Sequence, residues 1–169
     1  MYAGHAALAL LAKAKRPRVP MALLAPVAFA PDWIEWAFDA LGRHNREISH
    51  SLVAVGICAT LVALTYGVAR RDWSGAVAVW LTYASHWPAD FVTGRKPTWP
   101  SGPTVGLYLY TKPLADAAIE FAVIAVCWLA YRQSLPPDAR RRAMAWLVPV
   151  GLVVMHVAFL LATSPMVRP

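Results

Sequence analysis

Charged residues and cysteines are scarce in this chain of 169 residues. Only 15% of the residues are charged, against about 25% in soluble domains, which argues against a disordered tail, a charged coiled coil and an ordinary soluble enzyme. Cys58 and Cys127 lie in separate apolar segments without a CxxC motif, so we expect two packed thiols. No basic segment precedes the first apolar stretch, and we therefore expect no cleaved signal peptide.

Hydrophobic residues make up 59% of the chain, and the mean hydropathy is +0.46. Because lipid leaves no water for open backbone groups, this composition predicts an all-α, polytopic membrane helical bundle. Five segments are long enough to span a bilayer: Val19 to Leu41, Ser51 to Ala69, Trp73 to Val92, Leu114 to Tyr131 and Ala143 to Thr163. Tyr2 to Ala12 is too short and predicts a half-helix. We expect a single membrane domain over residues 1–169, of which 101–169 complete the bundle.

The net charge of +7 is divided unequally between the two ends of the predicted helices. Ten basic residues lie on one side if the helices alternate: Lys13, Lys15, Arg16, Arg18, Arg70, Arg71, Arg132, Arg140, Arg141 and Arg142. The other side holds Arg43, Arg46, Arg95, Lys96, Lys112 and Arg168. The positive-inside rule places the first set in the cytoplasm. Basic residues at membrane boundaries favour an anionic bilayer over nucleic acid as the partner.

Many ionisable residues lie within the predicted spans, where they are costly and mark functional sites. They are His5, Asp32, Glu35, Asp39, His50, His86, Asp90, Asp116, Glu120 and His156. At 1.5 Å per residue, six of them on four of the spanning helices reach about 18–30 Å above the basic ends, namely Asp32, His50, His86, Asp90, Asp116 and Glu120. His5 reaches only about 12 Å by the same count. The pattern predicts one polar layer toward the outer face.

Imidazoles and carboxylates in one layer are typical ligands of zinc or a similar divalent ion. His86 and Asp90 share a helix face at i, i+4, as do Asp116 and Glu120. Structural alternatives remain for single residues. His86 and Asp90 could form a plain hydrogen-bonded pair, and Asp32 could cap a helix. His156 is interpreted as a packed side chain, with an outer-shell role left open.

The order of motifs resembles the YdjM-like family of bacterial inner-membrane, metal-dependent hydrolases. The matching pieces are Gly4-His5, PDWIE at 31–35, RxxSHS at 46–51, SHWPAD at 85–90 and Trp99-Pro100. They cover about the first 100 residues. This family is in turn similar to the all-helical zinc-dependent phospholipase C and single-strand nuclease superfamily.

The resemblance implies a set of metal ligands, namely His5, Asp32, His50, His86, Asp90, Asp116 and Glu120. Asp116 stands where that superfamily has a histidine, so between one and three ions, most simply Zn²⁺, are expected. The resemblance also implies a multi-pass protein of the bacterial inner membrane, and the distribution of basic residues predicts a site toward the periplasmic side.

The function hypothesis is a membrane-embedded hydrolase that uses metal-activated water on a phosphoester of a lipid or lipid-linked substrate. Asp32 or Glu35 could serve as general base. Four basic residues on the same face are candidates for holding phosphate oxygens, and they could equally be interfacial anchors: Arg43, Arg46, Arg95 and Lys96. The Pro- and Gly-rich segment 93–112 is the candidate lid or substrate loop. Alternatives are a metal-ion or proton transporter, and an inactive structural protein of the same family. The oligomeric state stays open.

Overall fold

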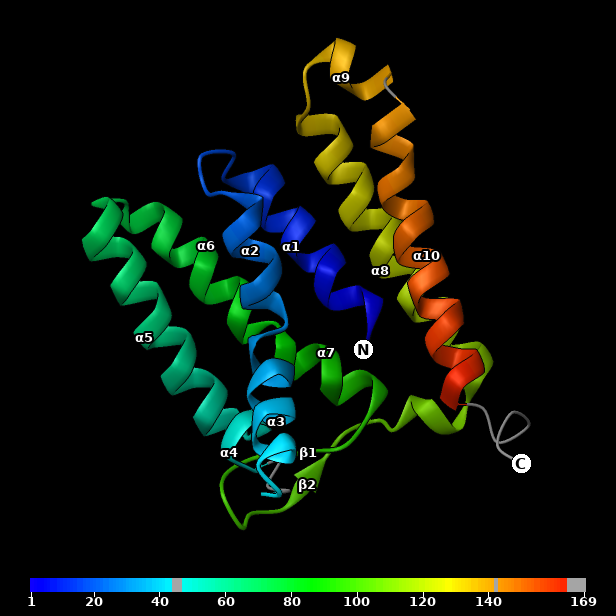
Figure 1. Ribbon diagram of the computed structural model, residues 1–169. Coiled ribbons are helices and arrows are strands. Elements are labelled where there is room, and N and C mark those ends of the chain that lie inside the picture. Colours follow the sequence, from blue (N-terminus) through cyan, green and yellow to red (C-terminus); the bar gives the residue numbers. More distant parts are fainter. Residues whose placement is uncertain (44–46, 142, 164–169) are drawn as a thin grey trace.

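The computed structural model describes residues 1–43, 47–141 and 143–163. It is mostly helical, with one two-stranded sheet (Figure 1). In chain order the helices are α1 (Ala3–Lys15), α2 (Met21–Ala28), α3 (Ala30–Ala40), α4 (Glu47–His50), α5 (Leu52–Arg70), α6 (Trp73–Ala84), α7 (His86–Thr93), η1 (Leu109–Thr111), α8 (Pro113–Ser134), α9 (Pro137–Arg141) and α10 (Ala143–Thr163). Strands β1 (Lys96–Pro97) and β2 (Thr104–Val105) pair antiparallel. The predicted all-α class is confirmed.

Two of the expected spans are each divided into two helices. The segment 19–41 breaks at Phe29, between α2 and α3, where Pro26 precedes the break and Pro31 begins the next helix. Proline removes a backbone donor and disfavours helical geometry in the residue before it. The segment 73–92 breaks at Ser85, between α6 and α7. Neither segment is one continuous helix, and each break lies close to predicted site residues.

Helices α5 and α8 are long and apolar enough to cross a membrane. The apolar stretch Trp146–Ala158 of α10 is shorter. Only 22% of the apolar window of α5 is buried, and Leu61 and Val68 on this helix are 59% and 68% exposed. A core helix of a soluble protein would bury most of such a surface. Two helices of the described chain could thus span a bilayer, while the five predicted spans remain an expectation.

Small residues let the helices approach closely. Ala59, Ala63 and Gly67 are buried at intervals of four along α5, and α6 packs against α5. A Cβ at Gly67 would lie 2.8 Å from the ring of Trp73 and 3.2 Å from the Cβ of Ala76. Contacts through small residues are typical of helices in lipid, where association depends on close packing.

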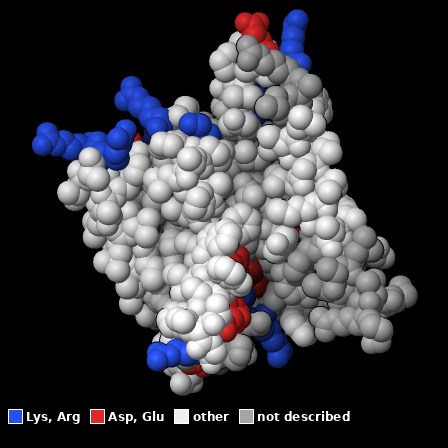
Figure 2. Space-filling view, viewed as in Figure 1, with Lys and Arg blue, Asp and Glu red and all other residues white. Residues whose placement is uncertain are grey.

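The division of the basic residues assumed that the helices alternate in direction, and the connections between helices can be compared with that assumption. The turns α1–α2, α5–α6 and α8–α9 lie at one end of the molecule, and α3, α4 and the sheet lie toward the other (Figure 1). In Figure 2, most of the visible Lys and Arg side chains gather at the first end, where little acidic surface is visible, and acidic side chains appear near α3. We call the first end the basic end. Cys58 and Cys127 are both free thiols, as expected.

Candidate metal centre

Four side chains from three helices meet beside the break between α6 and α7. They are Asp32 on α3, His50 on α4, and His86 and Asp90 on α7. One ligand atom from each lies within 4.8 Å of the others. The residues are buried except Asp32, whose side chain is 43% exposed. The sequence placed these four residues in one layer, and the structure brings them together.

The local sequence explains how each side chain reaches this point. Pro31 occupies the first turn of α3, so Asp32 lies at the start of that helix, directly after the break at Phe29. His50 ends the short helix α4, and Ser51 then caps α5 by accepting a hydrogen bond from the Ala54 N–H at 3.2 Å. His86 and Asp90 share one face of α7. The ligands therefore lie at helix ends, where the chain changes direction.

The two histidines are held by their Nδ1 atoms and present their Nε2 atoms to the same point. His86 Nδ1 lies 3.0 Å from the carbonyl oxygen of Ala28, which can only accept, so this nitrogen donates. His50 Nδ1 lies 3.2 Å from a carboxylate oxygen of Glu35 and 2.7 Å from Ser49 Oγ. The two Nε2 atoms are 3.2 Å apart. With Nδ1 protonated, each neutral ring offers an Nε2 lone pair, which is the arrangement of metal-binding histidines.

The two carboxylates complete the donor set. Asp32 Oδ1 lies 3.2 Å from His50 Nε2 and 3.5 Å from His86 Nε2. Asp90 Oδ2 lies 3.3 Å from His86 Nε2. Two imidazoles and two carboxylates match the donors that zinc takes in proteins. A metal ion is one way to neutralise the charge of Asp90. The ammonium group of Lys96 is another, because its Nζ atom lies 2.7 Å from Asp90 Oδ2.

His5 reaches this cluster although its counted height was too low. Its Nε2 atom lies 3.1 Å from Asp90 Oδ1, and its ring stacks on His86 with 3.9 Å between centroids. The main-chain nitrogen of Met1 also lies 2.7 Å from Asp90 Oδ1. Helix α1 has its first turn at the level of α7 (Figure 1), so the count from Lys13 underestimated the position of His5.

Asp116 and Glu120 form a neighbouring group on α8 rather than part of the four-residue cluster. Glu120 accepts hydrogen bonds from the main-chain N–H groups of Tyr2 and Gly4, at 2.6 and 2.8 Å. His156 Nδ1 lies 3.9 Å from Glu120 Oε2. Asp116 and His156 are fully buried, and their polar side-chain atoms have no hydrogen-bond partner within the described residues. The sequence interpretation of His156 was a packed side chain with an outer-shell role left open; His156 is buried and lies beside Glu120, a contact that residue type and height alone did not specify.

The candidate phosphate-binding residues take different positions. Lys96 lies on β1 and forms an ion pair with Asp90. Arg95 is exposed and lies over the ring of Tyr108, with 5.7 Å to the centroid. Arg43 is exposed after the end of α3. Arg46 falls outside the described residues.

A cavity of about 620 Å³ opens beside the cluster. Its walls include His5, Asp32, Glu35, Asp90, Lys96 and Tyr110. Trp33 and Trp36 of α3 also line it and are 58% and 68% exposed. Withdrawal of the Tyr110 hydroxyl from water raises the pKa of this phenol, so it stays protonated at neutral pH. A cavity of this size with apolar walls and a few convergent polar groups is typical of a ligand site.

No model of a known protein family matches the chain, and neither a characterised protein nor a solved structure is significantly similar to it.

Proposed function

We propose that the chain is a membrane-embedded, metal-dependent hydrolase that acts on a phosphoester of a lipid or lipid-linked substrate. The observation that carries the proposal is the cluster of Asp32, His50, His86 and Asp90, with ligand atoms within 4.8 Å of one another. A bound divalent ion, most simply Zn²⁺, would lower the pKa of a water molecule and polarise a phosphoryl oxygen. The neighbouring group on α8 and α10 is the candidate for a further ion.

The two acidic residues of α3 divide their roles according to position. Asp32 is partly exposed and lines the cavity, so it is the better candidate for accepting a proton from water. Glu35 contacts the outer nitrogen of His50, which makes it a positioning residue for that ring. Lys96 reaches into the same cavity and can balance the charge of a phosphate group.

The position of the cavity favours a lipid substrate. Exposed tryptophans stand at its edge on α3, and tryptophan is enriched at the membrane–water interface. The proposal therefore places the cluster near the outer boundary of a bacterial inner membrane. A transporter would need polar side chains toward both ends. Between the cluster and the basic end, the described core is formed by apolar residues such as Leu24, Val55 and Val79, which supports the hydrolase instead.

The first test is metal content. The full chain is purified in detergent, and bound metal is measured by mass spectrometry for wild type, His86→Ala, Asp90→Ala and the control Asp72→Asn. Asp72 caps α6 at the basic end, and asparagine preserves a cap. We expect stoichiometric divalent metal in wild type and the control, and its loss in the other two. Wild type without metal, or ligand variants that retain it, would contradict the site.

The second test is hydrolysis. Metal-loaded protein is assayed on a chromogenic phosphodiester and on phospholipid vesicles. Loss of a residue that only orients a metal ligand typically lowers activity by about 10–100-fold. We expect His86→Ala and Asp90→Ala to lower the rate of hydrolysis by more than about 100-fold. Stoichiometric metal without hydrolysis of any phosphoester would reject the enzymatic part of the proposal and retain the metal centre.

A further inference from the structure

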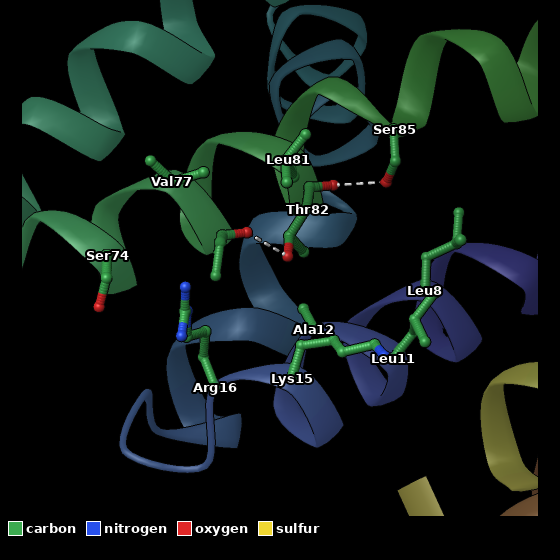
Figure 3. Close-up of a pocket in the computed structure, with 11 residues that line it drawn as sticks. Leu8, Leu11, Ala12, Lys15, Arg16, Ser74, Val77, Leu81, Thr82 and Ser85 are labelled. Carbon is green, nitrogen blue, oxygen red and sulfur yellow. Dashed lines mark hydrogen bonds between the residues drawn. The ribbon is translucent and has the colours of Figure 1, made fainter. Parts of the chain in front are cut away.

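A second cavity lies between α1 and α6 (Figure 3). Its volume is about 490 Å³. Leu8 and Leu11 of α1 form one wall, and Val77 and Leu81 of α6 form the other. Val77 and Leu81 are 58% and 55% exposed, so the groove opens to the surroundings of the bundle. We call this cavity the α1–α6 groove.

The inner part of the groove offers little hydrogen bonding to a ligand. Thr82 Oγ1 donates to the carbonyl oxygen of Ala78 at 2.7 Å, and Ser85 Oγ donates to the carbonyl oxygen of Thr82 at 2.8 Å. Figure 3 shows both interactions within α6 and the turn that follows it. The hydroxyl protons are thus used by the helix itself, and the surface suits an alkyl chain.

The opposite end of the groove is cationic. Lys15 and Arg16 are exposed there, at the end of α1, and Ser74 lies across from them on α6. Within the residues the structure describes, no carboxylate lies within 4 Å of either cation. Asp72 accepts from the Gly75 N–H at 2.8 Å and the Ser74 hydroxyl at 2.9 Å. The Gly75 N–H holds the pKa of Asp72 below its ordinary value. Asp72 interacts electrostatically with Arg16 and lines the same stretch of surface as both cations, but it forms no ion pair within 4 Å with either of them. Lys15 and Arg16 can therefore bind an external anion as well.

The length of the groove matches one leaflet of a bilayer. Ser74 and Ser85 are 11 residues apart along the chain, which corresponds to about 16 Å of helix. Half of a hydrocarbon core of about 30 Å is about 15 Å. A polar group at the basic end would then lie at the membrane surface, with its chain directed toward the bilayer centre.

We propose that the α1–α6 groove binds one anionic phospholipid, whose phosphate lies against Lys15 and Arg16 and whose acyl chain lies along Leu8, Leu11 and Leu81. Basic pockets between membrane helices on the cytoplasmic side are typical sites for anionic head groups. The volume falls within the range of about 300–1,000 Å³ that holds a small ligand. This lipid is a bound partner rather than the substrate, because the groove is lined by a set of residues separate from the cavity beside Asp32. The proposal requires the membrane location but not the metal centre.

The test measures thermal unfolding of the full chain after lipid has been removed in detergent. Dioleoyl phosphatidylglycerol, dioleoyl phosphatidylcholine and glycerol phosphate are added separately. We expect phosphatidylglycerol to raise Tm by about 5 °C, phosphatidylcholine to raise it less, and glycerol phosphate to have no effect. A double variant, Lys15→Gln with Arg16→Gln, should lose the preference for phosphatidylglycerol. The matched control, Arg70→Gln with Arg71→Asn, removes two charges at the same end outside the groove and should keep it.

A second variant tests the apolar part. Ala12→Phe fills the groove and should abolish the effects of both phospholipids. The proposal is overturned if the Lys15/Arg16 variant keeps the wild-type preference for phosphatidylglycerol. It is also overturned if the Arg70/Arg71 control loses this preference equally, because the charge of the basic end as a whole would then be responsible. An equal effect of glycerol phosphate would assign the site to a free phosphate. A change of oligomeric state in Ala12→Phe, with no lipid effect in wild type, would assign the groove to a second copy of the chain.

Discussion

At the scale of single residues, a metal site is indicated by how the rings of His50 and His86 are oriented, more than by the presence of two histidines. Each ring has an acceptor at Nδ1, a carboxylate for His50 and a main-chain carbonyl for His86. The carbonyl fixes Nδ1 of His86 as the donor, and the Glu35 carboxylate favours the same tautomer for His50, so that both Nε2 atoms turn a lone pair toward Asp32 and Asp90 when the rings are neutral. This arrangement is the strongest argument for a metal, because two facing lone pairs 3.2 Å apart repel each other unless a proton or a cation lies between them.

The positioning role of Glu35 leads to a prediction. Glu35→Ala should lower the affinity for Zn²⁺ by about 10–100-fold, because His50 loses the carboxylate that fixes its tautomer and ring orientation. Glu35→Gln should recover part of the affinity, since its amide oxygen can still accept. Competition with a chromogenic chelator measures both, with Asp138→Ala at the basic end as control. If Glu35→Ala binds Zn²⁺ with wild-type affinity, Glu35 does not position His50. If this variant binds no metal at all, Glu35 is itself a metal ligand.

At the scale of elements, the loop after α7 forms part of the wall around the candidate metal centre, which lies beside the helix breaks at Phe29 and Ser85. The segment 94–112 folds back on α7, with the Leu107 N–H donating to the Phe91 carbonyl oxygen at 2.8 Å. Within it, the paired strands β1 and β2 hold Lys96 beside Asp90. The loop therefore forms one wall of the cavity rather than a loose lid.

The close approach of this loop to α7 requires a glycine at position 106. Its φ is +155°, and an added Cβ would overlap the carbonyl oxygen of Gly94. Gly106→Ala should destabilise the protein by about 2 kcal/mol, because the loop must move away from α7. Thermal unfolding measures the change. Gly56→Ala is the control, since a Cβ there meets nothing within 4 Å and alanine favours the helix. Equal Tm values for the two variants would show that the loop is not docked in this way.

At the scale of the whole molecule, the cluster joins parts of the chain that are distant in sequence. Asp32 and Asp90 come from segments separated by the complete α5–α6 pair, and His5 comes from the first helix. Three buried ionisable groups beside the half-exposed Asp32 are costly in an apolar bundle. A divalent ion that neutralises them should therefore stabilise the entire fold.

Removal of metal should consequently lower Tm. With free Zn²⁺ at about 100 times Kd, binding contributes about 2.7 kcal/mol, which corresponds to about 5–10 °C for a chain of this size. Unfolding is compared with Zn²⁺ and with excess chelator, and His86→Ala should show no difference between the two conditions. A wild-type Tm that does not respond to chelator would argue for a metal-free hydrogen-bonded cluster.

The sequence by itself predicted the helical class and the shared layer that holds Asp32, His50, His86 and Asp90. These depend on composition and on the fixed rise of 1.5 Å per residue in a helix. The i, i+4 pairs His86–Asp90 and Asp116–Glu120 were visible for the same reason. The five spans, the identity of the metal and the reaction remain predictions.

Only the tertiary structure decided which polar residues meet. It joined Asp32, His50, His86 and Asp90, set Asp116 and Glu120 in a group with His156, and placed Lys96 on Asp90. Height along a helix is a local quantity, whereas contact between side chains depends on helix rotation, on the breaks at Phe29 and Ser85, and on packing through small residues. The position of His5 shows the difference, because the first turn of α1 lies at the level of α7, where the count along the chain had not placed it.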